Sequence, residues 1–244
     1  MMKWFRQVVF LLLMSPYFAN AGIAIESSRV IFLAKDRERS LMLSNTNAYP
    51  VIVQTWIDNG APEGTPEMAI SIPVIPLPGV FRLEPGEKKN LRLLSTQIAQ
   101  PQDRESLYWL NVYEIPPDNI DRPHDMTALN VAIRLQLKLF FRPLALPIPP
   151  DDIGNKLEFV LLRQPGSLTL KVGNPTPYFV TVNTAQINND GYRSDISVGM
   201  LSPFSEKSLS LSERAIGNGS YIYYMTINDD GNNVAMKKQL RFLP

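Results

Sequence analysis

The chain has 244 residues, with 24 Lys and Arg against 23 Asp and Glu, one His and no Cys. Without Cys there can be no disulfide, thiol nucleophile or Cys-ligated zinc, and a single His excludes multi-His metal centres. The formal charge of +1 argues against a nucleic-acid-binding surface, which usually needs a clearly basic domain. The 21 Pro residues disfavour a helical bundle, because each Pro inside a helix costs about 3 kcal/mol.

The first 21 residues have the pattern of a cleavable secretory signal peptide. Lys3 and Arg6 precede an apolar run at residues 8–14, and Ala19-Asn20-Ala21 supplies the small residues of a cleavage site. The apolar run is well short of the ~20 residues that cross a bilayer. We therefore expect an exported protein whose mature chain begins at Gly22 and does not insert into the membrane.

Segments rich in Val, Ile, Leu, Thr and aromatic residues then alternate with Gly, Pro, Asn and Asp clusters, which predicts short antiparallel strands. These segments are residues 23–33, 40–44, 49–57, 89–94, 107–113 and 129–141, followed by 157–162, 167–172, 179–187, 208–211, 221–227 and 234–242. Asp190-Gly191 and Asp230-Gly231 are hairpin signals. The pattern is typical of β-sandwiches, and no capped segment of helical period predicts a long helix.

The densest Pro cluster, at residues 142–150, interrupts the strand pattern. Pro lacks the N–H that a β-ladder needs, and Pro-rich segments form semi-rigid connections. We therefore predict an all-β protein of two sandwich domains. The predicted division is a signal peptide at 1–21, an N-terminal domain at 22–146 and a C-terminal domain at 147–244.

The segment at residues 129–141 is about twice as long as a typical strand of ~5–6 residues. Its apolar residues share one face of the strand: Leu129, Val131, Ile133, Leu135, Leu137 and Leu139. One interpretation is a long central strand whose apolar row fills the core of its own domain. The other is that part of the row is displayed, which is an aggregation hazard unless a partner covers it.

Ordered local motifs favour the second interpretation. They lie at residues 28–32, 44–57, 81–86, 92–93 and 101–109, and the most specific are Asn111-Val112-Tyr113-Glu114-Ile115-Pro116-Pro117, Lys138-Leu139-Phe140-Phe141-Arg142-Pro143 and Asn174-Pro175-Thr176-Pro177-Tyr178. In this order, and over essentially the whole mature chain, they resemble the periplasmic chaperones of the chaperone–usher pathway for pili and fimbriae.

The resemblance implies two immunoglobulin-like sandwiches joined at an angle, with a cleft between them. It also implies that the protein stabilises pilin subunits by lending them a strand, without ATP or any cofactor, and delivers them to an outer-membrane usher. The side chains implied to enter the subunit groove are Leu129, Val131, Ile133, Leu135 and Leu137. Burying each of them fully is worth ~1.5–3 kcal/mol.

Three further sets of residues match positions with known roles in this family. Arg29 and Lys138 match the cations that bind the subunit's C-terminal carboxylate, which calls for charge-assisted donors. Glu105, Arg142 and Asp229 match ion-paired residues that tie the two domains together. A surface facing the usher is matched by Pro50, Ile52, Gln54, Arg92, Ile115 and Pro117.

Other features bear on the subtype and on competing functions. The chain lacks the Cys pair of the long-loop subfamily and has a loop of moderate length at residues 116–128, which favours the short-loop type. Self-association of the free protein is a further way to cover the displayed row. A secreted fimbrial subunit or adhesive sandwich is the alternative function. An enzyme is the least supported, because the acidic pairs lie in turns or the linker and His124 is assigned no chemistry.

Overall fold

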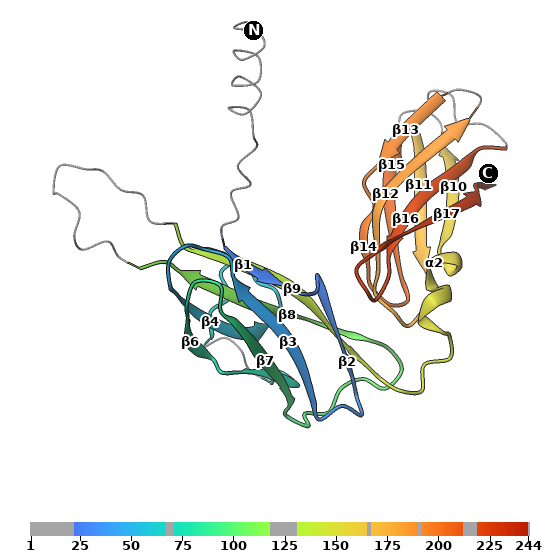
Figure 1. Ribbon diagram of the computed structural model, residues 1–244. Coiled ribbons are helices and arrows are strands. Elements are labelled where there is room, and N and C mark those ends of the chain that lie inside the picture. Colours follow the sequence, from blue (N-terminus) through green and yellow to red (C-terminus); the bar gives the residue numbers. More distant parts are fainter. Residues whose placement is uncertain are drawn as a thin grey trace, which may run out of the picture.

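The computed structural model describes residues 22–66, 71–117, 131–164, 167–189, 192–211 and 219–243. The predicted signal peptide, Leu129, His124 and the Asp190-Gly191 hairpin signal lie outside these ranges. Figure 1 shows that the described residues form two β-sandwiches set at an angle to each other.

The N-terminal sandwich has two sheets whose inward side chains form one core. The first sheet has the order β1 (Ile23–Ile25), β3 (Glu38–Asn45), β7 (Lys88–Ser95) and β5 (Val74–Leu77). The second has the order β2 (Arg29–Leu33), β9 (Ile133–Arg142), β8 (Ser106–Ile115), β4 (Val51–Asp58) and β6 (Val80–Leu83). Fully buried residues from both sheets, such as Phe32, Leu43, Val53 and Leu110, alternate with outward residues along their strands, as the pleat requires.

The C-terminal sandwich repeats this plan with its own core. One sheet has the order β15 (Ser205–Leu211), β11 (Ser167–Asn174), β10 (Glu158–Gln164) and β18 (Arg241–Leu243). The other has the order β13 (Tyr192–Ile196), β12 (Val180–Asn189), β16 (Tyr221–Ile227) and β17 (Asn233–Gln239), with β14 (Gly199–Leu201) also pairing with β12. The short helices η2 (Pro150–Asp152) and α2 (Ile153–Lys156) follow the Pro-rich connection.

The prediction of an all-β fold with two sandwiches is confirmed, but two predicted strands are each divided. Residues 23–33 form β1 and β2, which join different sheets of the N-terminal sandwich. Residues 234–242 form β17 and β18, which join different sheets of the C-terminal sandwich. In residues 234–242 the core-facing side chains of Met236, Leu240 and Phe242 continue one alternation, so the sequence pattern does not mark that crossing. In residues 23–33 the core-facing positions change from Ile23 and Ile25 to Val30 and Phe32, across the polar segment 26–28.

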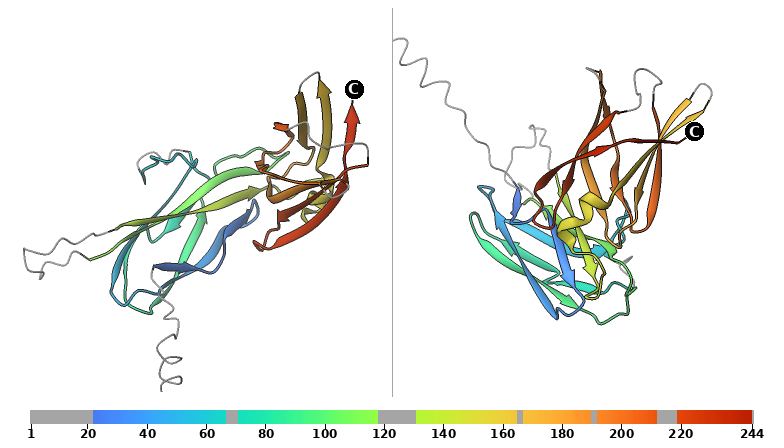
Figure 2. Two further views of the ribbon diagram at one scale, coloured as in Figure 1. Left: turned by 90° about the horizontal axis from the view of Figure 1, so that it is seen from above. Right: turned by 90° about the vertical axis from the view of Figure 1, so that its right-hand side faces the viewer.

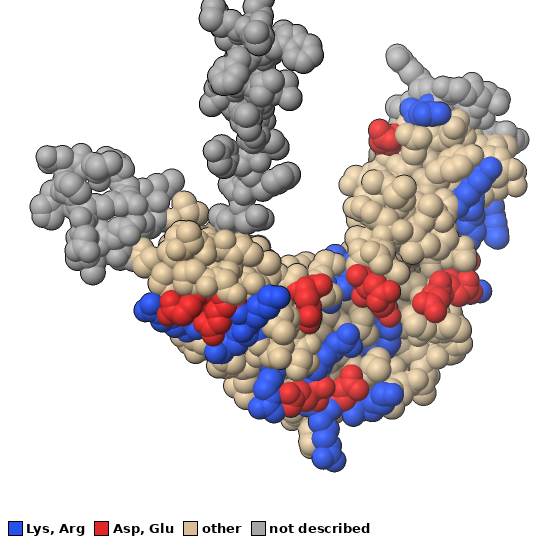
Figure 3. Space-filling view, in the orientation of Figure 1, with Lys and Arg blue, Asp and Glu red and all other residues tan. Residues whose placement is uncertain are grey.

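Figure 2 shows the same arrangement from two other sides, with contact between the sandwiches limited to one end of each. The space-filling view in Figure 3 shows a hollow on the concave side of the bend between them. The contact includes β2, the second half of β9 and Glu105 from the first sandwich. From the second it includes β12, the segment that precedes β12, β16 and the β16–β17 turn.

Candidate functional site

Only half of the long strand β9 has neighbours on both of its edges. β9 pairs antiparallel with β8 from Ile133 to Phe141, but it pairs with β2, in parallel, only from Lys138 to Arg142. Within the described residues, the half from Ile133 to Leu137 therefore has β8 as its sole strand neighbour. An edge of this kind offers backbone N–H and C=O groups to a strand of another chain.

The apolar row of β9 changes from exposed to buried along the strand. Val131, just before β9, is 56% exposed and Ile133 is 42% exposed, whereas Leu135 is half-buried and Leu137 is only 5% exposed. Leu137 lies in the core of the N-terminal sandwich, and Leu135 packs against that core.

The structure therefore corrects the prediction for Leu137, whose side chain fills its own domain instead of being displayed. The physical reason is length: the row extends beyond the facing sheet at its first residues and is covered by that sheet farther on. Both interpretations of the row thus hold, each for a different half of the strand. Val131 and Ile133 are the displayed part within the described residues.

Arg29 and Lys138, the two predicted carboxylate anchors, lie directly opposite each other on β2 and β9. Their side chains reach the C-terminal sandwich at its junction with the first. Arg29 Nη1 donates to the carbonyl oxygen of Ile227 at 3.2 Å, and Lys138 Nζ donates to Thr181 Oγ1 at 3.4 Å. The guanidinium of Arg29 lies 5.8 Å from the ring centre of Phe140. The structure thus brings the two predicted cations together at the junction between the sandwiches.

The environment of these two cations favours an anion. Burial lowers the pKa of Arg29, although the carboxylates of Asp229 and Glu105 oppose the shift. Burial also lowers the pKa of Lys138, and the neighbouring cation of Arg29 lowers it further. Among the described residues, Arg29 Nε is buried and has no hydrogen-bond partner. A carboxylate placed beside the two cations would relieve the repulsion between them.

The predicted ion-paired residues also come together, at the contact between the sandwiches. Arg142 Nε donates to Glu105 Oε1 at 2.6 Å, and its two terminal nitrogens donate to Asp229 at 2.6 and 2.7 Å. The second oxygen of Glu105 accepts the backbone N–H of Phe179 at 2.9 Å. Burial raises the pKa of Glu105 against the pull of Arg142, whereas the two carboxylates together raise the pKa of Arg142 despite its own burial.

The β16–β17 turn reaches the N-terminal sandwich at Gly231. This residue has a φ of +85°, the left-handed conformation that favours glycine, and a Cβ there would meet the side-chain oxygen of Ser28. The hairpin signal Asp230-Gly231 is confirmed.

Four of the six residues predicted to face the usher line one shallow pocket of about 80 Å³. They are Pro50, Ile52, Ile115 and Pro117, and Arg82 also lines the pocket. Gln54 lies two residues farther along β4 and is half-buried. Arg92 is on β7 in the other sheet, where its guanidinium is paired with Glu38 at 2.6 Å. The structure therefore does not place Arg92 among the residues that line this pocket.

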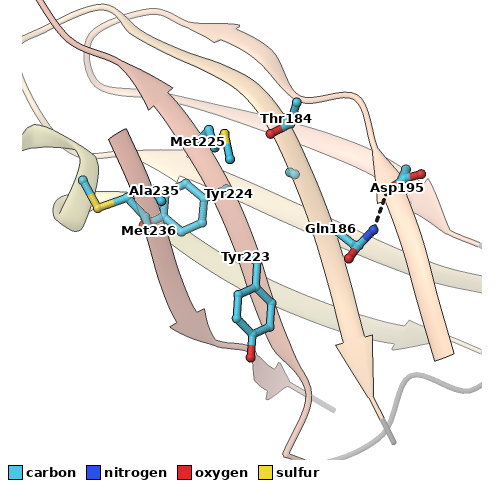
Figure 4. A pocket seen from close by; sticks show the side chains of 9 residues that line it. Thr184, Gln186, Asp195, Tyr223, Tyr224, Met225, Ala235 and Met236 are labelled. Carbon is cyan, nitrogen blue, oxygen red and sulfur yellow. Dashed lines mark hydrogen bonds between the residues drawn. The ribbon is translucent and has the colours of Figure 1, made fainter. Parts of the chain in front are cut away.

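A larger hollow of about 330 Å³ lies on the C-terminal sandwich, lined from β12, β13, β16 and β17 (Figure 4). Tyr223 and Met225 are exposed beside it, and Gln186 Nε2 donates to Asp195 Oδ1 at 2.8 Å. None of the predicted site residues lines it. Across the described part of the chain, no cluster of three or more His, Asp or Glu could hold a metal ion, and no helix could span a bilayer.

Some residues that support the site lie far from it along the chain and could not be found from the sequence. No spacing in the sequence connects Lys138 with Thr181, because only the docking of the two sandwiches places them in contact. Glu114 stands in one of the sequence motifs without a predicted role, yet its buried carboxylate accepts the N–H of Ile23 at 2.9 Å and the amide of Asn47 at 2.8 Å. Glu114 thereby connects β1 to the second sheet through hydrogen bonds.

Comparison with known proteins agrees with this geometry. The chain matches two family models: "Pili and flagellar-assembly chaperone, PapD N-terminal domain" over residues 22–147 and "Pili assembly chaperone PapD, C-terminal domain" over residues 152–238. It is 35% identical to the chaperone protein FimC of Escherichia coli strain K12 over 228 residues, 92% of this chain and 86% of that protein.

Solved structures extend the comparison to three dimensions. The crystal structure of the Pseudomonas aeruginosa CupB2 chaperone has a TM-score of 0.74 and 33% identity, covering 89% of this chain and all of that one. A structure of the Salmonella enterica SafA pilin in complex with the SafB chaperone has a TM-score of 0.73 and 27% identity, covering 92% and 99% of the two chains. The members of this family are chaperones and not enzymes. The chain therefore belongs to the PapD family of periplasmic chaperones that assemble pili in the chaperone–usher pathway.

Proposed function

We propose that this protein binds pilin subunits through the displayed half of β9 and the two cations at the sandwich junction. The observation that carries the proposal is the combination of a half-paired strand with an exposed apolar row that leads to Arg29 and Lys138. The solved SafA–SafB complex, in which a pilin is bound to a chaperone, supports the same kind of partner.

The strand donation would proceed from the exposed end of the row. Leu129, Val131 and Ile133 would enter the subunit's open groove, with Leu135 contributing the part of its side chain that its own core leaves free. A subunit strand added along the open edge would satisfy the backbone groups of residues 133–137 and fix the register. Because Leu137 is held in the core, the donated row ends before it.

The two cations would fix the position of the subunit's C-terminus on the chaperone. The C-terminal carboxylate would accept hydrogen bonds from Arg29 and Lys138, which are adjacent across β2 and β9. One unpaired Arg29 donor and two lowered pKa values support an anion at this position. An anchored carboxylate would also set the register of the subunit strand along β9, because it fixes one end of that strand.

The remaining assignments follow from the same function. Glu105, Arg142 and Asp229 would hold the angle between the domains, which we place at residues 22–146 and 147–244. The residues that would face the usher are Pro50, Ile52, Gln54, Arg92, Ile115 and Pro117. A signal peptide at residues 1–21 would be removed during export to the periplasm. The absence of Cys and the moderate loop at residues 116–128 support the short-loop type.

Co-expression with a pilin subunit of the same fimbrial system tests the anchor. We expect Arg29→Ala and Lys138→Ala to reduce the yield of periplasmic pilin strongly, while Arg37→Ala, which removes an exposed cation from the same domain, leaves it unchanged. Each variant should be purified and its thermal unfolding compared with that of the native protein. Equal pilin yield from all four folded proteins would refute the carboxylate anchor.

A further inference from the structure

The displayed half of β9 lacks most of what normally holds a strand in place. Within the described residues it has one strand neighbour instead of two, and the side chain of Ile133 is only partly buried. Ordering these backbone residues nevertheless costs conformational entropy. Some other interaction must therefore keep these residues extended and in register with β8.

Arg134 supplies such an interaction on the opposite face of the strand. Its Nε donates to Asn111 Oδ1 at 2.8 Å, its Nη1 to the carbonyl oxygen of Pro62 at 2.9 Å, and its Nη2 to Asp58 Oδ2 at 3.2 Å. Its guanidinium also lies 5.0 Å from the ring centre of Trp56. One side chain of the displayed half thus binds β8, β4 and the segment that follows β4.

The acceptors of Arg134 are themselves fixed. The Asp58 side chain is 2% exposed, and its oxygens also accept Trp56 Nε1 at 2.9 Å, Asn111 Nδ2 at 2.9 Å and the N–H of Gly60 at 2.8 Å. Gln136, two residues along from Arg134, donates to the same Asn111 oxygen at 2.9 Å. The carboxylate of Asp58 is therefore a rigid, buried, negatively charged acceptor that needs a cation.

We propose that Arg134 is a positioning residue for strand donation: it clamps the displayed half of β9 so that Val131 and Ile133 are held ready for the subunit. This inference rests on the proposed function, because it assigns a purpose to the order of that half. Holding a binding segment in its bound conformation removes the ordering cost from the binding step. The residue acts on the face away from the groove and does not touch the subunit itself.

Hydrogen exchange in the free protein tests the clamp without any partner. In Arg134→Ala we expect the β8-bonded amides of residues 133–137 to exchange at least about tenfold faster, because this half of the strand loses three hydrogen bonds from a charged side chain. The amides of residues 138–142, which belong to the same strand but pair with β2 as well, should keep their protection. Arg37→Ala is the matched control, and Arg134→Lys should restore part of the protection.

A double variant shows whether faster exchange comes from loss of the clamp or from general destabilisation of the protein. Arg134→Ala leaves Asp58 buried without its cation, so Arg134→Ala combined with Asp58→Asn removes both charges and should show the same local loss of protection. Faster exchange in both halves of β9, or in neither, would overturn the clamp.

Binding to a purified pilin subunit then supplies the functional readout. Arg134→Ala should bind several-fold more weakly than the native protein, with Arg134→Lys between the two. Unchanged affinity despite lost protection would overturn the positioning role. If the native protein itself failed to bind the subunit, the proposed function would fall, while the exchange data would still decide whether Arg134 orders the strand.

Discussion

Truncating the two displayed side chains should separate strand donation from the stability of the chaperone. The change is Val131→Ala together with Ile133→Ala. These residues are 56% and 42% exposed, and this exposed part is what a subunit groove can bury. Scaling a full burial of ~1.5–3 kcal/mol per side chain by these fractions gives a loss of about 1–3 kcal/mol in binding. That corresponds to a dissociation constant weaker by about 5- to 150-fold.

The free protein should lose less stability per truncated side chain than with Leu137→Ala, which provides the contrast. Leu137 is 5% exposed within the core, so its truncation should lower the free energy of unfolding by ~2–5 kcal/mol. By the scaling used above, the buried fractions of Val131 and Ile133 give a loss of about 1.5–3 kcal/mol for the double variant, or about half of that per side chain. The measurements are urea unfolding of each free protein and titration with a purified pilin subunit.

Two results would refute this reasoning. An unfolding loss per truncated side chain as large as that of Leu137→Ala would mean that both side chains belong to the core. A double variant with normal stability and unchanged subunit affinity would mean that they are displayed but are not donated.

Three further predictions concern the charged residues. Arg142→Ala should lower the free energy of unfolding by ~3–5 kcal/mol, because it leaves Glu105 buried without its cation. Asp229→Asn should lower it by at most ~1 kcal/mol, because the Asp229 side chain is 38% exposed. Equal losses for the two variants in urea unfolding would contradict this reasoning. Glu114→Ala should cost at least ~1–3 kcal/mol by leaving two buried donors unpaired, as measured by thermal unfolding against the conservative Glu114→Gln. Because burial lowers the pKa of Lys138, its side chain loses its charge at a pH below the ordinary lysine pKa of 10.5. Binding of a carboxylate-ended pilin peptide should therefore weaken as the pH rises toward 10.5, while the stability of the free protein rises over the same range because the unfolded chain holds that proton more tightly. Lys138→Arg should keep peptide binding constant there.

Much of the site could be predicted because its residues lie in short sequence motifs that follow one another in a recognisable order. Arg29 and Lys138 are in two of these motifs, and the structure places them opposite each other. The ion-paired residues Glu105, Arg142 and Asp229 likewise meet as the resemblance implied. Motifs preserve the identity of residues at fixed places in a fold, so a resemblance can transfer them one residue at a time.

What the sequence did not show depends on contacts between distant parts of the chain. Arg92 lies in the other sheet from the pocket that Ile52 helps to line, which no pattern in the two predicted strands indicates. The clamp made by Arg134 could not be predicted because its acceptors lie more than twenty residues away. Alternation places Arg134 on the outward face but does not say what meets it there.

The sequence by itself determined that the protein is built from strands in two sandwiches, since alternation, turn residues and the Pro-rich connection are local properties. It also determined that residues 129–141 share one apolar face. Only the tertiary structure decided which side chains on that face are buried in the core and which are exposed, because exposure depends on how far the opposing sheet extends over the face. Val131, Ile133 and Leu137 occupy equivalent positions in the pattern, yet they are 56%, 42% and 5% exposed.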